Sequence, residues 1–501
     1  MKIQKQGLRL TATPGAVITL FLNLPGEGRV REMVRRVEEL SDAQVHVCMA
    51  GVQQGFGGRH RRLRETWLDH FHRVEDQYGS GLSHFGMERQ LLLGAFFTKE
   101  YSIQAAALFN PSMVPHPDQE GLAPDERRFI MSLRATGEGH ISSIVFRTGI
   151  VDGNGGIGLD AQSGFYTRLR RIGHGGGDGG ASGDGARSSS AGSEEGRATG
   201  QEREEREERE QAGAKPVDGA GGDAAGGDAR GESGDDMNYT LGDPSTIPID
   251  EQVLFPHAKD ESMGMEDLRL VKFEDKGCSR YYGTYTAYDG LRIQTKLIET
   301  EDFYRYRIRT LSGAAVSDKG MALFPEKIGG KFAMISRQGG QHIQIMFSDD
   351  LYRWESCQLL MKPKFDWELL QLGNCGSPIK TARGWLLLTH GVGAMRKYVI
   401  SAILLKLDDP SRVIGRLDKA LITAEGADRE GYVPNVVYTC GAMLHGPLLV
   451  IPYAVSDSAT ACVTLALDEL LRELEYSAAR ENSPGQSAGQ APHLKPSTKQ
   501  P

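Results

Sequence analysis

The sequence has few cysteines and no long hydrophobic run. Its six cysteines are scattered over 501 residues, and no two of them form a CxxC pair. We therefore expect neither a disulfide scaffold nor a cysteine-built zinc site, and reduced thiols fit a cytoplasmic protein better. No stretch approaches the length of a membrane-spanning helix, so we expect no membrane partner.

An excess of positive charge is absent as well. Lys and Arg number 58 against 66 Asp and Glu, which gives a formal net charge of −8. This balance argues against a nucleic-acid partner. The thirteen histidines include His70 and His72, but residues two apart face different sides of a helix. No metal site is expected.

A cleavable leader is also not expected. The apolar run AVITLFLNL (16–24) follows several basic residues, but it is short and has no small-x-small cleavage site. We interpret it as a strand or a buried segment. Three segments after or near it have apolar residues at helical spacing, namely 29–40, 58–74 and 86–97. Residues 1–100 are therefore predicted to be a mostly helical extension, which could pair with a second copy of the chain as a homo-oligomer.

Two segments have little to bury. Residues 172–243 contain the runs GHGGGDGG, EREEREERE and AGGDAAGGD, and residues 476–501 are similarly polar. Both are predicted to be disordered, the first as a long insert that splits one domain. The glycine run is not a strand–loop–helix cradle, so a nucleotide site is not expected there.

The remaining segments, 101–171 and 244–475, show weak internal repetition. Short polar anchors are followed by paired strand-like runs, and the last four anchors recur every 50–60 residues or so. They are NPS (110–112), EDLR (266–269), FPEK (324–327), GSPIK (376–380) and VPNVV (433–437). This period is typical of propeller blades, so the sequence predicts an all-β, five-bladed β-propeller whose anchors converge on one channel.

Seven segments resemble glycoside hydrolase family 130, whose members act on β-mannosides, mostly as inverting phosphorylases. The matching segments are NPS (110–112), SLRATGEGHISSIVFRTG (132–149), EDLR…YYGTYTAYDG (266–290), KGMALFPEKIGGKFAMISR (319–337), GSPIKTARGWLLLTHG (376–391), EGYVPNVVYTCG (430–441) and AVSDSATACVTLALDELL (454–471). Where the family pattern Glu-Asp-Pro-Arg has proline, this sequence has Leu268. Leucine restricts the backbone φ angle less than proline does.

The acid is predicted at Asp267. Inverting cleavage needs one acid to protonate the leaving oxygen, and phosphate can serve as the nucleophile without a second carboxylate. The resemblance implies that Asp267 gives this proton through a sugar hydroxyl. Glu266 would raise its pKa and Arg269 would lower it. Because side chains alternate along a strand, only one of Glu266 and Asp267 is expected to face the channel. The alternative is a strand-end aspartate paired with Arg269.

Four basic residues are candidates for holding phosphate, because charged donors make short hydrogen bonds to its oxygens. They are Arg292, Lys327, Arg337 and His390. The resemblance supports Lys327 and His390 best, although a structural histidine and a turn lysine are the plain alternatives. No cofactor is expected beyond inorganic phosphate as co-substrate.

Sugar hydroxyls need short polar groups and an aromatic face. The candidates are Asn110, Ser112, Arg134, Glu266, Arg269, Tyr288, Asp289 and Asp457. Tyr288 could equally be a packed strand aromatic, and Asp289 before Gly290 could be a turn residue.

The prediction is an inverting phosphorylase that cleaves a β-1,2- or β-1,4-linked manno-oligosaccharide and releases mannose 1-phosphate. One alternative is a phosphate-independent β-mannosidase, for which Glu138 or Glu430 would be the second acid. The other is a carbohydrate-binding propeller without turnover.

Overall fold

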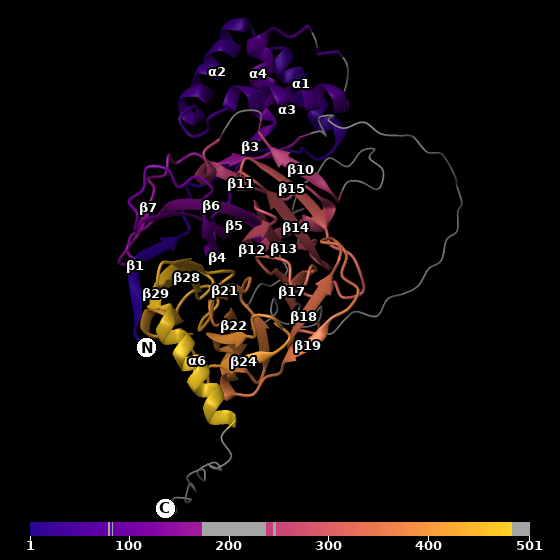
Figure 1. Cartoon of the computed structure of the whole chain (residues 1–501). Coiled ribbons are helices and arrows are strands. Elements are labelled where there is room, and N and C mark those ends of the chain that lie inside the picture. Colours follow the sequence, from indigo (N-terminus) through magenta and orange to yellow (C-terminus); the bar gives the residue numbers. More distant parts are fainter. Residues whose placement is uncertain (79–80, 83, 173–236, 244–246, 483–501) are drawn as a thin grey trace, which may run out of the picture.

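The computed structural model describes residues 1–78, 81–82, 84–172, 237–243 and 247–482. The described chain is mostly β, and its helices lie near the two ends (Figure 1). The α-helices are α1 (Glu27–Glu38), α2 (Asp42–Phe56), α3 (Leu63–Tyr78), α4 (Met87–Phe96) and α6 (Leu467–Asn482).

The strands form five sheets within these residues. The largest, of 12 strands, runs in the order β4 (Ala107–Pro115), β5 (Arg127–Thr136), β6 (Ser142–Val151), β12 (Gly264–Asp275), β13 (Cys278–Tyr288), β14 (Ile293–Thr300), β15 (Arg305–Thr310), β10 (Tyr239–Gly242) and β9 (Arg170–Arg171). Three short strands join this sheet: β7 (Ile157–Leu159) and β11 (Gln252–Leu254) pair with β6, and β8 (Thr167–Arg168) pairs with β11.

The four-, six- and five-stranded sheets follow in chain order, except that β1 (Ile3–Thr11), from the N-terminal region, belongs to the five-stranded sheet. The four-stranded sheet is β16 (Ala322–Leu323), β17 (Phe332–Ser336), β18 (Ile343–Ser348) and β19 (Gln358–Met361). The six-stranded sheet contains β20 (Gln371–Asn374), β21 (Ile379–Thr381), β22 (Gly384–Val392), β23 (Tyr398–Leu405), β24 (Val413–Arg416) and β25 (Ile422–Thr423). The five-stranded sheet contains β1 (Ile3–Thr11), β26 (Val437–Tyr438), β27 (Met443–His445), β28 (Leu448–Val455) and β29 (Ala459–Ala466), and the two-stranded sheet pairs β2 (Val17–Phe21) with β3 (Thr98–Ser102).

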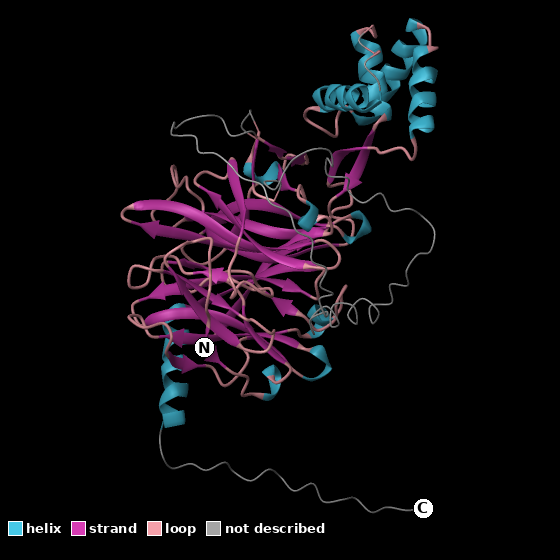
Figure 2. Cartoon of the chain, turned by 90° about the vertical axis from the view of Figure 1, so that its right-hand side faces the viewer, coloured by secondary structure: helices cyan, strands magenta, loops and turns pink. Residues whose placement is uncertain are grey.

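The helices α1–α4 form a unit with its own core that stands off one end of the sheets (Figure 2). The predicted helices near 29–40, 58–74 and 86–97 are confirmed as α1, α3 and α4, and the run 16–24 contains the strand β2. Helix α2 was missed because its sequence DAQVHVCMAGVQQGF has apolar residues on its exposed side, where Val47 is 70% exposed, so no clear polar face marks it.

The bounds of the predicted helical extension, insert and C-terminal tail differ from those in the structure. Strand β1 lies inside the range assigned to the helical extension, yet it pairs antiparallel with β29 and so belongs to the sheets. Strand β10 lies inside the range 172–243, because Tyr239 and Leu241 are buried and pair with β15. Helix α6 extends past 476. Residues 173–236 and 483–501, where the rest of both predictions falls, lie outside the described residues.

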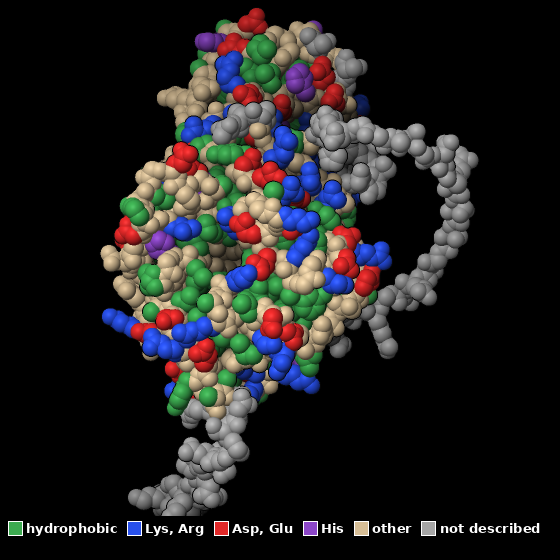
Figure 3. Space-filling model, in the orientation of Figure 1, with side chains coloured by type: hydrophobic (Ala, Val, Ile, Leu, Met, Phe, Trp, Pro, Cys, Tyr) green, Lys and Arg blue, Asp and Glu red, His purple; other side chains and the backbone are tan. Residues whose placement is uncertain are grey.

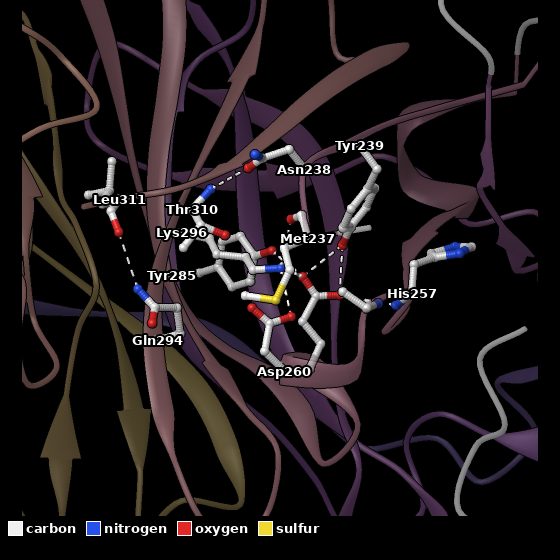
Figure 4. A network of polar contacts seen from close by, with 12 residues as sticks. Met237, Asn238, Tyr239, His257, Asp260, Tyr285, Gln294, Lys296, Thr310 and Leu311 are labelled. Atoms are coloured by element: carbon white, nitrogen blue, oxygen red, sulfur yellow. Dashed lines mark hydrogen bonds and ion pairs between the residues drawn. The ribbon is translucent and has the colours of Figure 1, made fainter. Parts of the chain in front are cut away.

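A buried polar network holds the chain where it returns at residue 237 (Figure 4). The Lys296 ammonium donates to Asp260 Oδ1 at 2.8 Å, to Glu261 Oε1 at 3.0 Å and to the Met237 carbonyl at 3.1 Å. The hydroxyls of Tyr239 and Tyr285 also donate to Glu261. Lys296 and Glu261 are fully buried. Buried charges are tolerated only when paired and hydrogen-bonded, as they are here.

Ion pairs connect the helical unit to the sheets. Arg61 makes a two-pronged pair with the buried carboxylate of Glu251, and Arg62 pairs with Asp243. Bidentate guanidinium–carboxylate pairs fix orientation as well as distance. The short segment between α2 and α3 is therefore the junction between the two parts of the molecule.

Candidate active site

Asp267 and Asn110 face each other from two strands that both bulge. The register of β12 with β13 shifts between Glu266 and Arg269, and that of β4 with β5 shifts between Phe109 and Ser112. Asp267 has φ 56° and Asn110 φ 47°, a conformation that non-glycine residues adopt rarely. The Asn110 amide donates to Asp267 Oδ1 at 2.7 Å. Bulges and such strained residues often aim side chains at functional sites.

The bulge changes which way the two acids of β12 point. Arg134 Nη2 lies 2.6 Å from Glu266 Oε1, and its Nη1 lies 3.4 Å from Asp267 Oδ1. The expectation that strand alternation would separate the two carboxylates is therefore wrong, because the extra bulge residue breaks the two-residue period. Both acids meet one guanidinium.

The positive groups around Asp267 favour the ionised form of its carboxyl. Burial raises its pKa, but the guanidiniums of Arg134 and Arg269, the Asn110 amide and the Lys319 ammonium hold that pKa below its ordinary value. A carboxylate in this state accepts hydrogen bonds and gives no proton until the surrounding positive charge is compensated.

Arg269 holds three parts of the chain together beneath Asp267. Its guanidinium donates to the Cys375 carbonyl at 2.9 Å, to the Asp267 carbonyl at 3.0 Å and to the Tyr438 hydroxyl at 2.7 Å. The side chain is almost fully buried. Arg269 therefore fixes the backbone of Asp267 relative to the strands β20 and β26, and its donors are engaged by protein.

Lys319 and Arg337 extend the positive charge beside the two acids. Lys319 Nζ lies 3.4 Å from Glu266 Oε2, and Arg337 Nε donates to the Lys319 carbonyl at 3.3 Å. Between them Gly320 has φ +90°, and a Cβ there would lie 3.0 Å from Arg337 Nε. Only glycine fits this turn without strain, so the turn brings Lys319 to the site.

His390 lies on β22, directly across from Gly373 on β20. Its ring stacks on Tyr398 and meets Tyr438 edge-on at 5.0 Å between ring centroids. Burial, together with the charges of Arg337 and Arg269, lowers the pKa of His390 well below its ordinary value. The imidazole is therefore neutral and can contribute one N–H and one acceptor.

Three buried polar atoms around this site lack a hydrogen-bond partner in the described part of the chain. They are Asn110 Oδ1, Asn374 Oδ1 and His390 Nδ1. Asn374 itself is fully buried and donates to the Gly320 carbonyl at 2.8 Å. Buried polar groups nearly always find partners, so these atoms fit a hydrogen-bonding ligand. The molecular surface is hollowed over β4 and β12 (Figure 3).

Other predicted sugar contacts lie in structural positions or at the edge. Ser112 is fully buried, and its Oγ accepts from the Leu270 N–H at 3.1 Å, which ties β4 to β12. Asp289 Oδ1 accepts from the N–H groups of Leu291 and Arg292 and so closes a turn. Arg292 is exposed in that turn.

Tyr288 and Asp457 lie nearer the acids. Tyr288 pairs with Gly264 at the start of β12, and its hydroxyl donates to the Gly290 carbonyl. Asp457 has φ 48° in the β28–β29 turn, and its charge, like those of Glu266 and Asp267, raises the pKa of Arg134 against the effect of burial.

Lys327 is not brought to this site. Its ammonium pairs with Asp275 at 2.9 Å, at the opposite end of β12 from Asp267, and covers the ring of Phe332. The expectation that Lys327 lies near Asp267 is corrected accordingly, and Lys319 is the lysine that lies beside the two acids. Glu138 and Glu430, the candidates for a second catalytic acid, are both exposed.

Comparison with known proteins gives the family. A family model described as beta-1,4-mannooligosaccharide phosphorylase matches residues 241–475. A 1,2-beta-oligomannan phosphorylase of Thermoanaerobacter sp. is 34% identical over 234 residues, which span 44% of this chain and 75% of that protein. The chain belongs to glycoside hydrolase family 130.

Two further relatives of this family 130 chain were found. A beta-1,2-mannobiose phosphorylase of Listeria innocua is 32% identical over 239 residues, 46% of this chain and 66% of that protein. A solved beta-1,2-mannobiose phosphorylase from Listeria innocua aligns with 74% of this chain and 92% of its own, with 18% identity and a TM-score of 0.45. The family match begins after Asn110 and Arg134, and the structure places both beside Asp267, as their candidacy for the site predicted.

Sequence reasoning missed Lys319, Asn374 and Tyr438. Lys319 begins the segment KGMALFPEKIGGKFAMISR, but the anchor FPEK within that segment favoured Lys327 as the candidate. Asn374 lies two residues before GSPIK, with Cys375 between them. Only its burial, which the sequence does not show, distinguishes it from an ordinary strand residue.

No metal-binding cluster of three His, Cys, Asp or Glu side chains occurs among the described residues. His70 instead bonds to the Thr98 hydroxyl. None of the helices that the structure describes is both long and apolar enough to cross a membrane. All six cysteines lie in described segments and are free thiols.

Proposed function

We propose that this family 130 chain is an inverting phosphorylase that cleaves a β-mannoside with inorganic phosphate and releases mannose 1-phosphate. One observation carries the proposal: a buried carboxylate, Asp267, lies within a cluster of cations formed by Arg134, Lys319 and Arg337. The names of the relatives support it, because the two described above are phosphorylases of β-1,2-mannosides.

The cations and His390 would hold phosphate. A phosphate oxygen attacks the anomeric carbon as the bond to the leaving sugar oxygen breaks, and a proton from Asp267, passed through a sugar hydroxyl, ends on that oxygen. Lys319 and Arg337 supply charged donors, and neutral His390 supplies an N–H. Arg292 and Lys327 have no part in this proposal.

Phosphate also explains how an ionised aspartate becomes an acid. The charges that hold the Asp267 pKa down are those of Arg134, Arg269 and Lys319. A bound phosphate dianion offsets this positive charge, so the pKa of Asp267 rises when phosphate enters. Proton donation is thereby coupled to the presence of the nucleophile.

The reacting mannose would contact Asn110, Arg134, Glu266 and Asp457. Asn110 has an unpartnered acceptor, and the others surround Asp267 on the same side of β12. Ser112, Arg269 and Asp289 would act indirectly by holding strands and turns in place, and Tyr288 would border the sugar.

We further propose the five-bladed propeller for the sheets. Its support is the series β4, β12, β16, β20 and β26, each of which begins a set of antiparallel strands near an anchor motif. The 12-stranded sheet would contain two blades, joined by the single pairing of Gly264 with Ser142. The free thiols support a cytoplasmic location. Self-association through α1–α4 stays a prediction, and light scattering of the full chain tests it.

The deciding experiment compares β-1,2- and β-1,4-mannobiose, each with and without phosphate. We expect mannose 1-phosphate in phosphate buffer and no cleavage without phosphate. Equal release of free mannose in phosphate-free buffer would establish a β-mannosidase instead. Binding without turnover in either buffer would indicate a carbohydrate-binding propeller.

A further inference from the structure

The helical unit contains an apolar cavity that is separate from the candidate active site around Asp267. Its volume is about 120 Å³. Its walls come from all three of α2, α3 and α4, and its floor comes from β2 and β3. The lining residues are Thr19, Val52, Phe56, His60, Leu63, Trp67, Leu92, Ala95, Phe96, Thr98 and Glu100. We call this cavity the helical-unit pocket.

Two of the helices that line the helical-unit pocket pack closely against each other. Helices α3 and α4 touch through their backbones, since a Cβ on Gly94 would lie 1.8 Å from the Trp67 carbonyl oxygen. Trp67 and Leu92 are almost fully buried at the base, whereas Phe56 and Phe96 are 43% and 42% exposed. The pocket therefore has a buried base at Trp67 and Leu92 and two half-exposed aromatic rings in its lining.

The size and lining define the apolar part of an occupant. An apolar cavity of about 150 Å³ in another protein stays dry and takes up benzene. The helical-unit pocket is of that order, and aromatic and aliphatic side chains line most of it. One six-membered ring fits such a space, whereas a sugar with several hydroxyls would leave its polar groups unpaired against these walls.

The floor adds one polar position. Glu100 lies directly across from Thr19 in the β2–β3 pair. Glu100 Oε1 accepts from Arg59 Nε at 2.7 Å and from His60 Nε2 at 2.8 Å, and Oε2 accepts from Arg59 Nη2 at 3.0 Å. An ionised carboxylate has about four acceptor positions, so one further donor can bind to Oε2.

The charge state of the floor suits such a donor. Burial raises the pKa of Glu100, but the bonds from Arg59 and His60 outweigh it and hold the pKa below its ordinary value. The carboxylate is therefore ionised at neutral pH. A hydroxyl or amine on the ring would make a charge-assisted hydrogen bond to it, which is stronger than a neutral one.

We propose that the helical-unit pocket binds a phenol-sized ring compound that carries one hydrogen-bond donor. The ring occupies the space between Phe56, Trp67 and Phe96, and its donor bonds to Glu100. Arg59 and His60 directly precede Arg61 and Arg62, which form the junction with the sheets. A bound ring thus braces α2 against β3 next to the contacts that orient the helical unit.

The test uses the full chain and two probes of similar size, phenol and toluene, with binding followed by Trp fluorescence and ligand-observed NMR. Both probes are expected to bind saturably, and phenol is expected to bind about tenfold more tightly because of its charge-assisted bond. Ala95→Phe fills the pocket and is expected to weaken both probes by about tenfold or more. The matched control is Ala50→Phe on the exposed side of α2, which is expected to leave binding unchanged.

A second variant separates the polar contact from the cavity. Glu100→Gln is expected to reduce the preference for phenol by about threefold or more and to leave toluene binding intact. Absence of saturable binding of either probe, or equal binding to Ala95→Phe and the parent chain, would overturn the proposal. Should Ala95→Phe fail to fold, the ratio of phenol to toluene binding in Glu100→Gln still decides it.

Discussion

Asn110 donates a hydrogen bond to Asp267, and each residue lies on a bulged strand with positive φ. Strained conformations of this kind cost on the order of 1–3 kcal/mol each and persist only where the surrounding structure enforces them. Here Arg269 and the strand pairs enforce them. The two strands together present one carboxylate and one amide to the same space, which neither regular strand would do.

The carboxylate of Asp267 is the first target. Asp267→Asn keeps the shape and removes the acid, so kcat for phosphorolysis is expected to fall by about 10²–10⁴-fold, the usual contribution of a general acid. The matched control is Asp275→Asn on the same strand, which breaks only the pair with Lys327. Its activity is expected to stay within about twofold of the parent. Comparable losses in both variants would contradict the role of Asp267.

Variants of Lys327 and Lys319 distinguish the phosphate site that the sequence predicts from the one that we propose from the structure. Lys319→Ala removes a cation 3.4 Å from Glu266 and is expected to raise KM for phosphate by about tenfold or more. Lys327→Ala is expected to leave it unchanged, since that ammonium pairs with Asp275. Initial rates over a range of phosphate concentrations measure both. A larger effect at Lys327 would restore the original prediction.

The buried network around Lys296 is expected to be a large contributor to stability. Lys296→Met leaves Asp260 and Glu261 without their cation, and breaking a buried pair in this way costs roughly 3–5 kcal/mol. Lys331→Met, which breaks the exposed pair with Asp349, is expected to change the free energy of unfolding by no more than about 0.5 kcal/mol. Urea unfolding of both variants measures the difference, and similar midpoints would contradict it.

Acid is expected to destabilise the fold partly through His257. Its Nε2–H donates to the Leu169 carbonyl and its Nδ1 accepts from Arg168, so the ring must be neutral. Burial and the Arg168 charge lower the pKa of His257 from 6.5 to about 3. Below pH 6.5 the unfolded chain binds a proton that the folded chain refuses. The stability from this group is therefore complete above pH 6.5 and is lost as pH falls toward 3.

The matching variant is His257→Gln, which retains an amide donor and acceptor but does not titrate. Its free energy of unfolding is expected to fall less steeply between pH 6.5 and pH 4 than that of the parent chain, by up to about 1.4 kcal/mol per pH unit. His46→Gln on the exposed side of α2 serves as the control and is expected to follow the parent curve. Identical slopes for all three proteins would refute the assignment.

The sequence predicted which residues form the candidate site better than it predicted how their side chains are arranged. The resemblance of EDLR to the family motif singled out Asp267, and the anchors NPS and EDLR supplied Asn110 and Asp267, which the structure brings together. It did not reveal the bulge that turns Glu266 and Asp267 toward one guanidinium, since an irregularity of one residue leaves no compositional signal.

Turn conformations and long-range strand pairing are further features that the sequence did not predict. Lys319 and Lys327 are both near FPEK, and only the turn at Gly320 decides which one reaches the acids. The pairing of β1 with β29 joins residues that no local pattern relates. Helix α2 escaped notice because its exposed side is apolar.

That pairing has a consequence for how the molecule is made. Strand β1 (Ile3–Thr11) is synthesised well before its partner β29 (Ala459–Ala466), because most of the sequence shown lies between them. The sheet that contains both strands therefore cannot be completed before β29 has been synthesised, and its formation requires closure of a loop hundreds of residues long. Contacts between such distant segments slow folding and leave strand edges exposed in the meantime. Between the synthesis of these two strands, the nascent chain therefore has an unpaired β1 edge that a chaperone would have to shield.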